Sequence, residues 1–184
     1  MSSIVRWCAV LCAAVLAACA TSPAVAPTPA FDLTGRMVVR FQNRGFTSAV
    51  RWTQNGGSDD IWLTAALGQT IAYLRADRDG ATLTAADQRQ YHASSIENLT
   101  KSAFGWRFPV AGMRHWVFGQ PAPGMTTAAV ERDDASRITR LSQDDWQVVF
   151  NYADPGAARP SRVEAAGADA EIRFVIDGLT MPQP

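Results

Sequence analysis

The chain has 184 residues, of which 47% are apolar and 18% charged, and its formal net charge is zero. This composition suits one globular domain and is too apolar for a disordered chain. Lysine occurs once, at Lys101, and no basic block is present, so the electrostatic footprint of a nucleic-acid-binding protein is absent. All three cysteines lie within the first twenty residues, which excludes a disulfide framework, a cysteine nucleophile and a cysteine metal site from the rest of the chain.

The N-terminus has the pattern of a secretory signal. Arg6 precedes a twelve-residue apolar run, 7–18, which is shorter than the roughly 20 residues that a membrane-spanning helix requires. The sequence LAAC at 16–19 matches the bacterial lipobox, in which the cysteine is acylated and becomes the new N-terminus. We therefore predict a signal peptide at 1–18 and a covalent N-acyl diacylglycerol on Cys19. The alternative is a buried N-terminal helix with an incidental cysteine.

A proline-rich segment follows the cysteine. Residues 20–30 read ATSPAVAPTPA, and eleven extended residues at about 3 Å each give a tether with a reach of about 30 Å. Ala20 stands where an aspartate would favour the inner membrane of enterobacteria, so the outer membrane is predicted. The predicted organisation is a signal peptide at 1–18, the lipidated cysteine and tether at 19–30, and a single domain at 31–184.

From residue 31 the hydrophobic pattern mostly has a period of two. In 46–54, for example, Val50 and Trp52 share one face, whereas Arg51 lies on the other. Such alternation predicts half-buried antiparallel strands, and turn signals rich in Gly, Asp and Asn separate them. We predict about eleven strands, at 31–42, 46–54, 60–65, 69–76, 80–85, 87–91, 127–132, 136–142, 145–152, 160–165 and 170–177.

Two short helices are predicted between the sixth and seventh strands. The first begins with a capping box, in which Ser94 accepts from the backbone of Glu97 and Glu97 reaches back, and Gly105 ends it. The second runs over 109–118, with proline at its start and Gly119 just past its end. This pattern predicts a mainly β (α+β) fold, in which a strongly curved antiparallel sheet carries the helices on its concave side.

Large aromatic side chains occupy the inward positions of the predicted elements. They are Trp52, Phe104, Trp116, Trp146, Phe150 and Phe174. An ordinary packed core would account for them. So would a sheet and lid that do not close tightly and leave an apolar cavity. The residues alone leave both interpretations open.

No catalytic constellation is visible in the sequence. Paired aspartates at 59–60, 133–134 and 144–145 each lie in a predicted turn, and His92 and His115 have no identifiable catalytic partner. Phosphate-loop, dinucleotide, zinc-protease and serine-hydrolase motifs are absent. We therefore predict no enzymatic activity, no metal and no cofactor apart from the lipid on the cysteine.

Several segments together carry a family resemblance. They are FDLTGR at 31–36, VRW at 50–52, LTAALGQT at 63–70, the run from Phe108 to Pro121, SQDDWQVVF at 142–150 and PSRV at 160–163. In order and spacing these segments resemble the LolB family of outer-membrane lipoproteins. The resemblance implies an unclosed half-barrel of about eleven strands, with helices over an apolar cavity.

The resemblance also implies a function. The cavity would receive the acyl chains of a lipoprotein from the periplasmic carrier LolA and pass them to the outer membrane without nucleotide. The implied partners are a LolA-like carrier, cargo acyl chains and outer-membrane lipid, with the protein a monomer on the periplasmic face of a Gram-negative outer membrane. The implied cavity lining is Trp52, Phe104, Met113, Trp116, Trp146, Phe150 and Phe174.

Leu67 precedes Gly68 in a chain reversal between two predicted strands. On the resemblance, its side chain dips into the bilayer surface and helps acyl chains leave the cavity. The alternative is a loop residue tucked back into the core.

The sequence departs from the family pattern in two places. Ala66 stands where the family usually has proline, and 177–179 stand where a tryptophan often ends the last strand. Two other classes of function remain as alternatives. One is a structural or assembly lipoprotein with an ordinary packed core, and the other is a periplasm-facing hydrolase, which would need perturbed titratable groups in a polar pocket.

Overall fold

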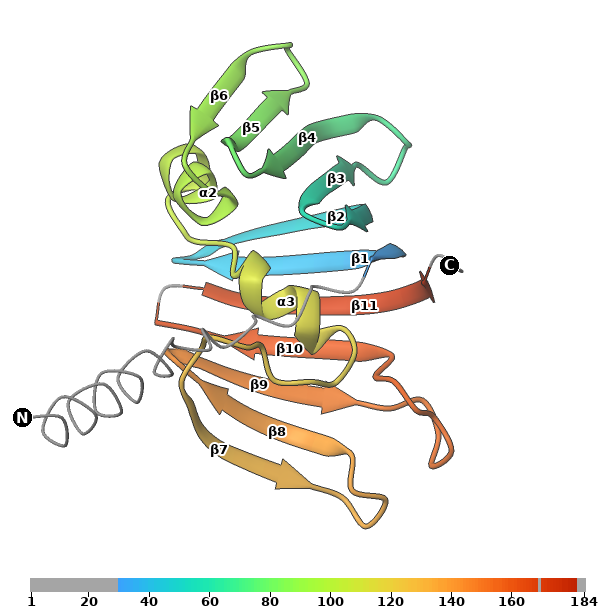
Figure 1. Cartoon of the computed structure of the whole chain (residues 1–184). Coiled ribbons are helices and arrows are strands. Elements are labelled where there is room, and N and C mark those ends of the chain that lie inside the picture. Colours follow the sequence, from blue (N-terminus) through green and yellow to red (C-terminus); the bar gives the residue numbers. More distant parts are fainter. Residues whose placement is uncertain (1–29, 169, 182–184) are drawn as a thin grey trace, which may run out of the picture.

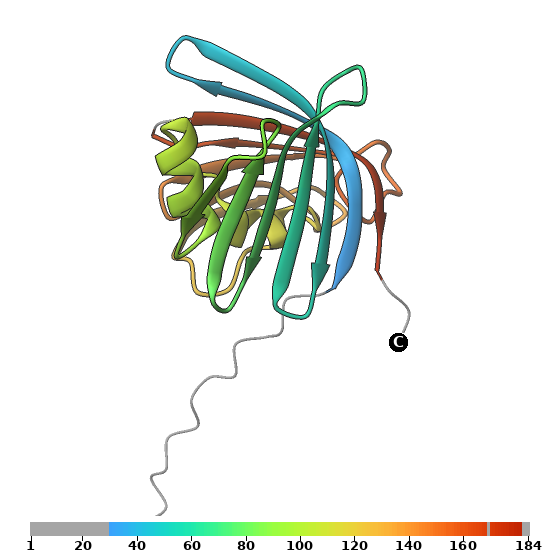
Figure 2. The same ribbon diagram turned by 90° about the horizontal axis from the view of Figure 1, so that it is seen from above.

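The computed structural model describes residues 30–168 and 170–181, which form one antiparallel sheet curved around two short helices (Figures 1 and 2). The strands are β1 (Phe31–Phe41), β2 (Arg44–Asn55), β3 (Ser58–Thr64), β4 (Thr70–Asp77), β5 (Gly80–Ala85), β6 (Gln90–Ala93), β7 (Thr127–Arg132), β8 (Ile138–Gln143), β9 (Trp146–Asn151), β10 (Arg162–Ala166) and β11 (Ala170–Thr180). Their order across the sheet is β6-β5-β4-β3-β2-β1-β11-β10-β9-β8-β7. Among the described residues no pairing joins the edges β6 and β7, so the predicted mainly β, unclosed fold is confirmed.

The period-two pattern of the strands decides which face of the sheet is buried. In β1, Phe31, Leu33, Met37 and Val39 are buried on the concave face, whereas Arg36 is exposed on the other. The convex face carries cross-strand ion pairs such as Arg36–Asp177, which contribute little to stability because both groups are solvated. The apolar interior therefore lies entirely on the concave side, beneath the helices.

Antiparallel connections alternate between the two ends of the sheet. We call one end the rim; it carries the β1–β2 turn at 42–43 and the β3–β4 loop at 65–69. Residues 44–48 of β2 extend past the last β2–β3 pair, Ala49–Thr64, so the β1–β2 hairpin protrudes beyond its neighbours. Figure 2 shows this hairpin and the β3–β4 loop at the top, with the start of β1 at the opposite end.

The first helix, α2 (Ile96–Phe104), begins one residue later than predicted. Ser95 Oγ accepts the Asn98 backbone N–H at 3.2 Å, while Ser94 Oγ accepts from the Asn98 side chain at 2.9 Å. Glu97 does not reach back, because its Oε1 accepts the backbone N–H of Ala111 at 3.3 Å. The predicted cap at Ser94 is therefore wrong: two consecutive serines offer the same chemistry, and the helix uses the second. Its predicted end, Gly105, is confirmed by a left-handed φ of 87°.

The second helix, α3 (Val110–Trp116), is shorter than the predicted 109–118. Pro109 is its N-cap residue, and after Trp116 the chain turns through hydrogen bonds such as Gly119 N–H to the Trp116 carbonyl at 2.8 Å. Within the described residues, neither this helix nor α2 is long and apolar enough to cross a membrane. Figure 1 shows α2 beside β5 and β6, and α3 over the middle of the sheet.

Candidate functional site

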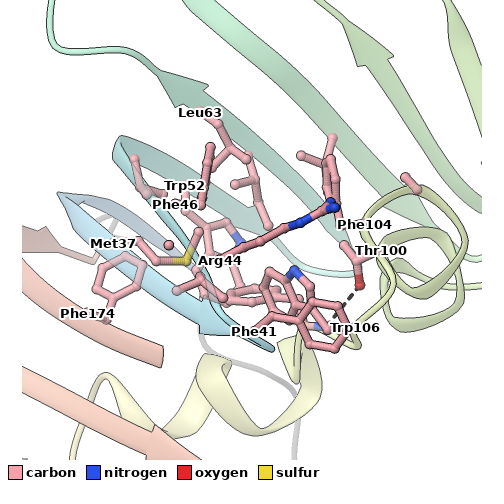
Figure 3. Close-up of a pocket in the computed structure, with 17 residues that line it drawn as sticks. Met37, Phe41, Arg44, Phe46, Trp52, Leu63, Thr100, Phe104, Trp106 and Phe174 are labelled. Atoms are coloured by element: carbon pink, nitrogen blue, oxygen red, sulfur yellow. Dashed lines mark hydrogen bonds between the residues drawn. The ribbon is translucent and has the colours of Figure 1, made fainter. Parts of the chain in front are cut away.

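An apolar cavity of about 340 Å³ opens between the concave face of the sheet and α2 (Figure 3). Strands β1 to β4 form one wall, and α2 with the segment 105–109 forms the other. Of its seventeen lining residues, fifteen are apolar or glycine, and the exceptions are Arg44 and Thr100. This volume is within the range of small-molecule sites, and the lining has the chemistry to receive a hydrocarbon chain.

Aromatic side chains form both the floor and the opening of the cavity. Trp52 is fully buried at the floor, and Trp106 and Phe108 pack edge to face at 6.2 Å between ring centroids. Towards the opening, Phe46 is only partly buried and Phe104 is 43% exposed. The cavity thus has buried aromatic rings at its floor and partly exposed ones at the rim.

A buried carboxylate fixes the floor of the cavity to α3. Asp59 is 0% exposed, and its Oδ1 accepts the Trp52 indole N–H at 2.9 Å and the Arg114 Nε–H at 3.1 Å. Its Oδ2 accepts a further hydrogen bond from Arg114. Because a buried charge without partners is strongly unfavourable, these contacts hold Trp52, β3 and α3 in one arrangement.

The Thr100 hydroxyl is already used within the protein. It accepts the backbone N–H of Phe108 at 2.9 Å, which connects α2 to the second wall segment. The only other polar lining residue is therefore Arg44.

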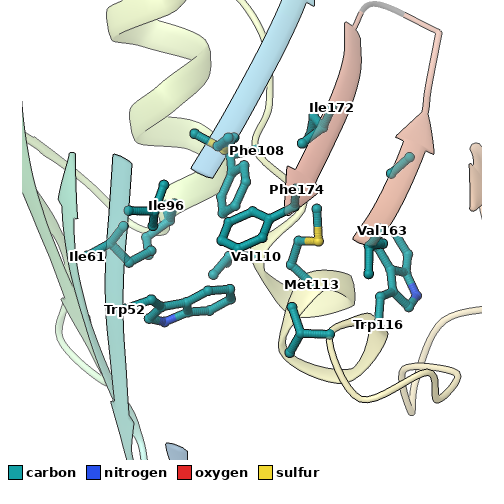
Figure 4. Close-up of a cluster of buried hydrophobic side chains, with 14 of the residues drawn as sticks. Trp52, Ile61, Ile96, Phe108, Val110, Met113, Trp116, Val163, Ile172 and Phe174 are labelled. Carbon is teal, nitrogen blue, oxygen red and sulfur yellow. The ribbon is translucent and has the colours of Figure 1, made fainter. Parts of the chain in front are cut away.

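Beneath α3 the space is filled. Trp116 is fully buried and donates its indole N–H to Gln143 Oε1 at 2.9 Å, and its ring centroid lies 6.2 Å from that of Trp146. Gln143 Nε2 in turn donates to the carbonyl of Ala122 at 2.7 Å. Figure 4 shows Met113 and Trp116 of α3 packed against Val163 of the sheet. This region is an ordinary packed core.

The structure divides the seven residues expected to line the cavity. Three of them, Trp52, Phe104 and Phe174, are in its lining. The other four lie outside it, in the filled region beneath α3: Met113, Trp116, Trp146 and Phe150. The hydrophobic periodicity of the predicted strands and helices gives the same signal for both groups, because it marks the inward face of an element without showing what packs on it.

Several lining residues were not among those expected from the sequence. Phe46 had a signal, since it shares a face with Trp52 in β2. Trp106 and Phe108 had no periodicity signal, because they lie in the segment between the two helices, where the hydrophobic pattern has no regular period.

Leu67 is 89% exposed at the rim, the same end of the sheet as the cavity opening. Its loop is closed by two hydrogen bonds, Gly68 N–H to the Ala65 carbonyl at 2.9 Å and Ala65 N–H to the Gln69 carbonyl at 2.8 Å. Gly68 has a φ of 81°, which glycine adopts without strain. The alternative of a leucine tucked into the core is excluded.

The last strand ends differently from the prediction. β11 continues to Thr180 rather than ending at 177, because Thr180 pairs with Asp32 of β1. Asp177, in this last part of β11, binds Arg36 through two hydrogen bonds of 2.9 and 3.1 Å.

The two histidines occupy different surroundings. His92 Nδ1 lies 3.0 Å from Thr82 Oγ1 on the neighbouring strand. Burial, and then the charge of Arg114, lower the pKa of His115 below its usual value. The residues that the structure describes contain no group of three His, Cys, Asp or Glu side chains able to hold a metal.

The predicted signal peptide, Cys19 and residues 20–29 of the tether lie outside the described residues.

Comparison with known proteins gives a consistent result. The family model described as outer membrane lipoprotein LolB matches residues 29–178. The outer-membrane lipoprotein LolB of Nitrosomonas europaea is 37% identical over 151 residues, which cover 80% of this chain and 71% of that protein. The LolB of Thiobacillus denitrificans is 35% identical over 173 residues, covering 88% and 90%. Among solved structures, a DUF1329 family protein from Desulfovibrio piger has the same fold, with a TM-score of 0.50 at 7% identity, covering 85% of this chain and 86% of that one.

Proposed function

This chain belongs to the LolB family of outer-membrane lipoproteins, and from that premise we propose that the cavity beneath α2 holds the acyl chains of lipoproteins on their way into the outer membrane. As a family member, the protein is an outer-membrane lipoprotein that takes part in the localisation of other lipoproteins. One observation carries the finer assignment: the cavity is apolar and opens at the rim, where Leu67 is exposed.

The magnitude of the hydrophobic effect explains why such a cavity is needed. Burying one methylene contributes about 0.8 kcal/mol, so exposing the roughly 45 methylenes of three acyl chains to water would cost on the order of 35 kcal/mol. A LolA-like carrier therefore brings the cargo to this protein, a monomer, and the chains pass from one apolar site to another. The bilayer holds the chains more favourably than the cavity does, so the final step requires no nucleotide.

Anchoring comes from the proposed lipid on Cys19, which matches the lipobox cysteine. Three acyl chains hold a protein durably at a membrane, whereas one chain does so only marginally. Mass spectrometry of the mature N-terminus should find diacylglycerol on Cys19, and Cys19→Ala should yield unlipidated protein. An unmodified Cys19 in the wild type would contradict the anchor.

Leu67 has a separate role, in release rather than in uptake. Its exposed side chain would insert into the bilayer surface, since burying a leucine is worth about 1.5–3 kcal/mol. That energy is too small to anchor the protein beside three acyl chains but large enough to orient the rim towards the membrane.

Binding of an acylated peptide tests the cavity. Trp52 and Trp106 line it, so their emission should change when an acylated peptide is added, and the melting temperature should rise with peptide concentration. The same peptide without its acyl chains should do neither. If saturating acylated peptide changes neither quantity, the cavity is not the site, and a structural lipoprotein becomes the better interpretation.

Transfer to liposomes tests Leu67. Leu67→Glu should leave the melting temperature and cargo uptake from the carrier unchanged, while transfer into liposomes falls at least tenfold. Met181→Glu is a matched control, because Met181 is 48% exposed just after β11 ends, opposite the rim. Wild-type transfer by the Leu67 variant, or an equal loss in the control, would remove Leu67 from the mechanism.

A further inference from the structure

Arg44 is the one ionisable side chain among the residues that line the cavity. It is exposed at the start of β2, directly after the β1–β2 turn, where Gln42 adopts a φ of 44°. Figure 3 shows its side chain extending towards Phe104 of α2, among the other residues that line the cavity. A cation thus lies over an apolar cavity, at the end through which a ligand would enter.

The surroundings of Arg44 differ from those of most arginines in the described part of the chain. Nine arginines form ion pairs, for example Arg36 with Asp177 and Arg51 with Asp32. Within the described residues, Arg44 has no ion pair or side-chain hydrogen bond, and no Asp or Glu lines the cavity. Its donors are therefore available to a bound ligand.

A bound acyl chain has one end that needs such donors. The methylenes gain free energy in the cavity, but the carbonyl at the head of the chain loses its water and costs free energy unless it finds a hydrogen bond. A guanidinium carries five N–H donors and stays charged, so it suits both an ester carbonyl and a carboxylate. At the rim, it would meet the head of a chain whose tail lies towards Trp52.

We propose that Arg44 binds the acyl carbonyl: its guanidinium donates hydrogen bonds to the ester or carboxylate oxygen at the head of a chain held in the cavity. This assignment rests on the proposed function, because it requires that the cavity hold acyl chains. It makes Arg44 a specificity residue, which distinguishes acyl chains from other hydrocarbons and fixes the direction in which a chain enters. The oxygen can come from a diacylglycerol ester of cargo or from a free fatty acid.

Ligand displacement separates these possibilities. The protein used is the chain from Ala20 onward, which contains every helix and strand that the structure describes. Direct titration with N-phenyl-1-naphthylamine, a neutral apolar dye, measures the cavity itself. Displacement of the dye by decanoate measures carboxylate binding, and displacement by methyl decanoate measures ester binding. Melting temperatures confirm that each variant is folded.

The variants are Arg44→Met and Arg44→Lys. Arg44→Met should leave the dissociation constant of the dye within about twofold and weaken decanoate and methyl decanoate about tenfold or more. Arg44→Lys should retain more affinity for the carboxylate than for the ester, since a lysine keeps the charge without the planar fork. The control is Arg78→Met, which removes the same charge in the exposed β4–β5 turn, away from the rim, and should change nothing.

Each outcome decides a specific point. Weakening of both ligands supports an acyl-carbonyl contact, and weakening of decanoate alone supports it with a free fatty acid as the source of the oxygen. Normal binding of both ligands by Arg44→Met overturns the assignment and leaves the cavity in place. A loss of dye binding in that variant also overturns it, because Arg44 would then only shape the opening. If the wild type binds no dye and no ligand, the proposed function itself fails.

Discussion

α3 and α2 lie over the same concave face of one sheet, but the space beneath the two helices differs. Beneath α3, Trp116 fills the gap to the strands and is hydrogen-bonded to Gln143, which is itself fully buried. Beneath α2, only the first turns pack closely, through Ile96 and Leu99. Further along the helix the inward residue is Ala103, which leaves the cavity open.

The difference follows the size of the side chains that α2 directs at the sheet. Helix residues three or four positions apart share a face, so Leu99 and Ala103 both face the sheet. Leu99 is fully buried, whereas Ala103, which has no atoms beyond Cβ, is only partly buried and lines the cavity. Phe104, the next residue, lies at the opening and is 43% exposed, so it does not close the gap from above.

The largest expected effect compares an aromatic residue from each region. Trp116→Ala should lower the free energy of unfolding by about 3–5 kcal/mol, because it leaves a hole in a filled core. Phe104→Ala should lower it by less than about 1 kcal/mol, because that ring is partly solvated already. Urea denaturation of both variants measures the difference. Equal losses would mean that the region beneath α2 is a core like the other.

A pair of glycines gives a smaller effect of the same kind. A Cβ on Gly112 of α3 would lie 2.4 Å from a ring carbon of Trp116, whereas a Cβ on Gly45, in the cavity lining, would have no atom within 4 Å. Gly112→Ala should therefore lower the free energy of unfolding by about 1–2 kcal/mol, since overpacking outweighs the better helix propensity of alanine. Gly45→Ala should be neutral or stabilise slightly. If Gly112→Ala leaves the free energy of unfolding unchanged, the Trp116 ring can shift to accommodate a methyl group, and the core beneath α3 is less tightly packed than its contacts indicate.

Filling the cavity with a larger side chain should make the region beneath α2 a packed core like the one beneath α3. Ala103→Leu adds apolar atoms where the helix leaves space, so the free energy of unfolding should change by less than about 1 kcal/mol, in the stabilising direction. Affinity for an acylated peptide should fall about tenfold or more, because the leucine occupies the ligand's volume. Retained affinity would place the ligand elsewhere. A large loss of stability would show that α2 already packs as closely as it can.

Much of the fold could be predicted from the sequence, since strand patterns are local. The differences arise where pairing over long distances decides the boundary. β6 was expected at 87–91 and lies at 90–93, because Ala85 to Arg89 close a loop in which Gln88 has a φ of 65°. β11 extends past its predicted end because it pairs with β1, which lies at the other end of the domain in sequence but next to β11 in the sheet.

The cavity itself was not predictable to the same degree. The strand pattern around Trp52 and the helix pattern around Trp116 both predict an inward side chain, and both residues are fully buried. The residues that pack against them come from distant segments of the chain, Phe108 against Trp52 and Gln143 and Trp146 against Trp116, and the local pattern does not show these contacts. The exposure of Leu67 was easier to predict, because a glycine-containing reversal between two strands directs its side chain outward independently of the packing elsewhere in the domain.

The smallest expected effect is a dependence of stability on pH near α3. His115 follows Arg114, and burial and then the charge of Arg114 lower the pKa of His115 in the folded protein. The unfolded chain then binds the proton more readily, with a pKa of about 6.5, so stability is present above that pH and is lost as the pH falls below it. His115→Gln removes this contribution. The difference in free energy of unfolding between variant and wild type should therefore shift in favour of the variant between pH 7.5 and pH 5.5, as measured by urea denaturation. A difference that stays constant over this range would mean that His115 is as accessible to protons as an exposed histidine, and that the region around α3 is less tightly packed than the contacts of Trp116 indicate.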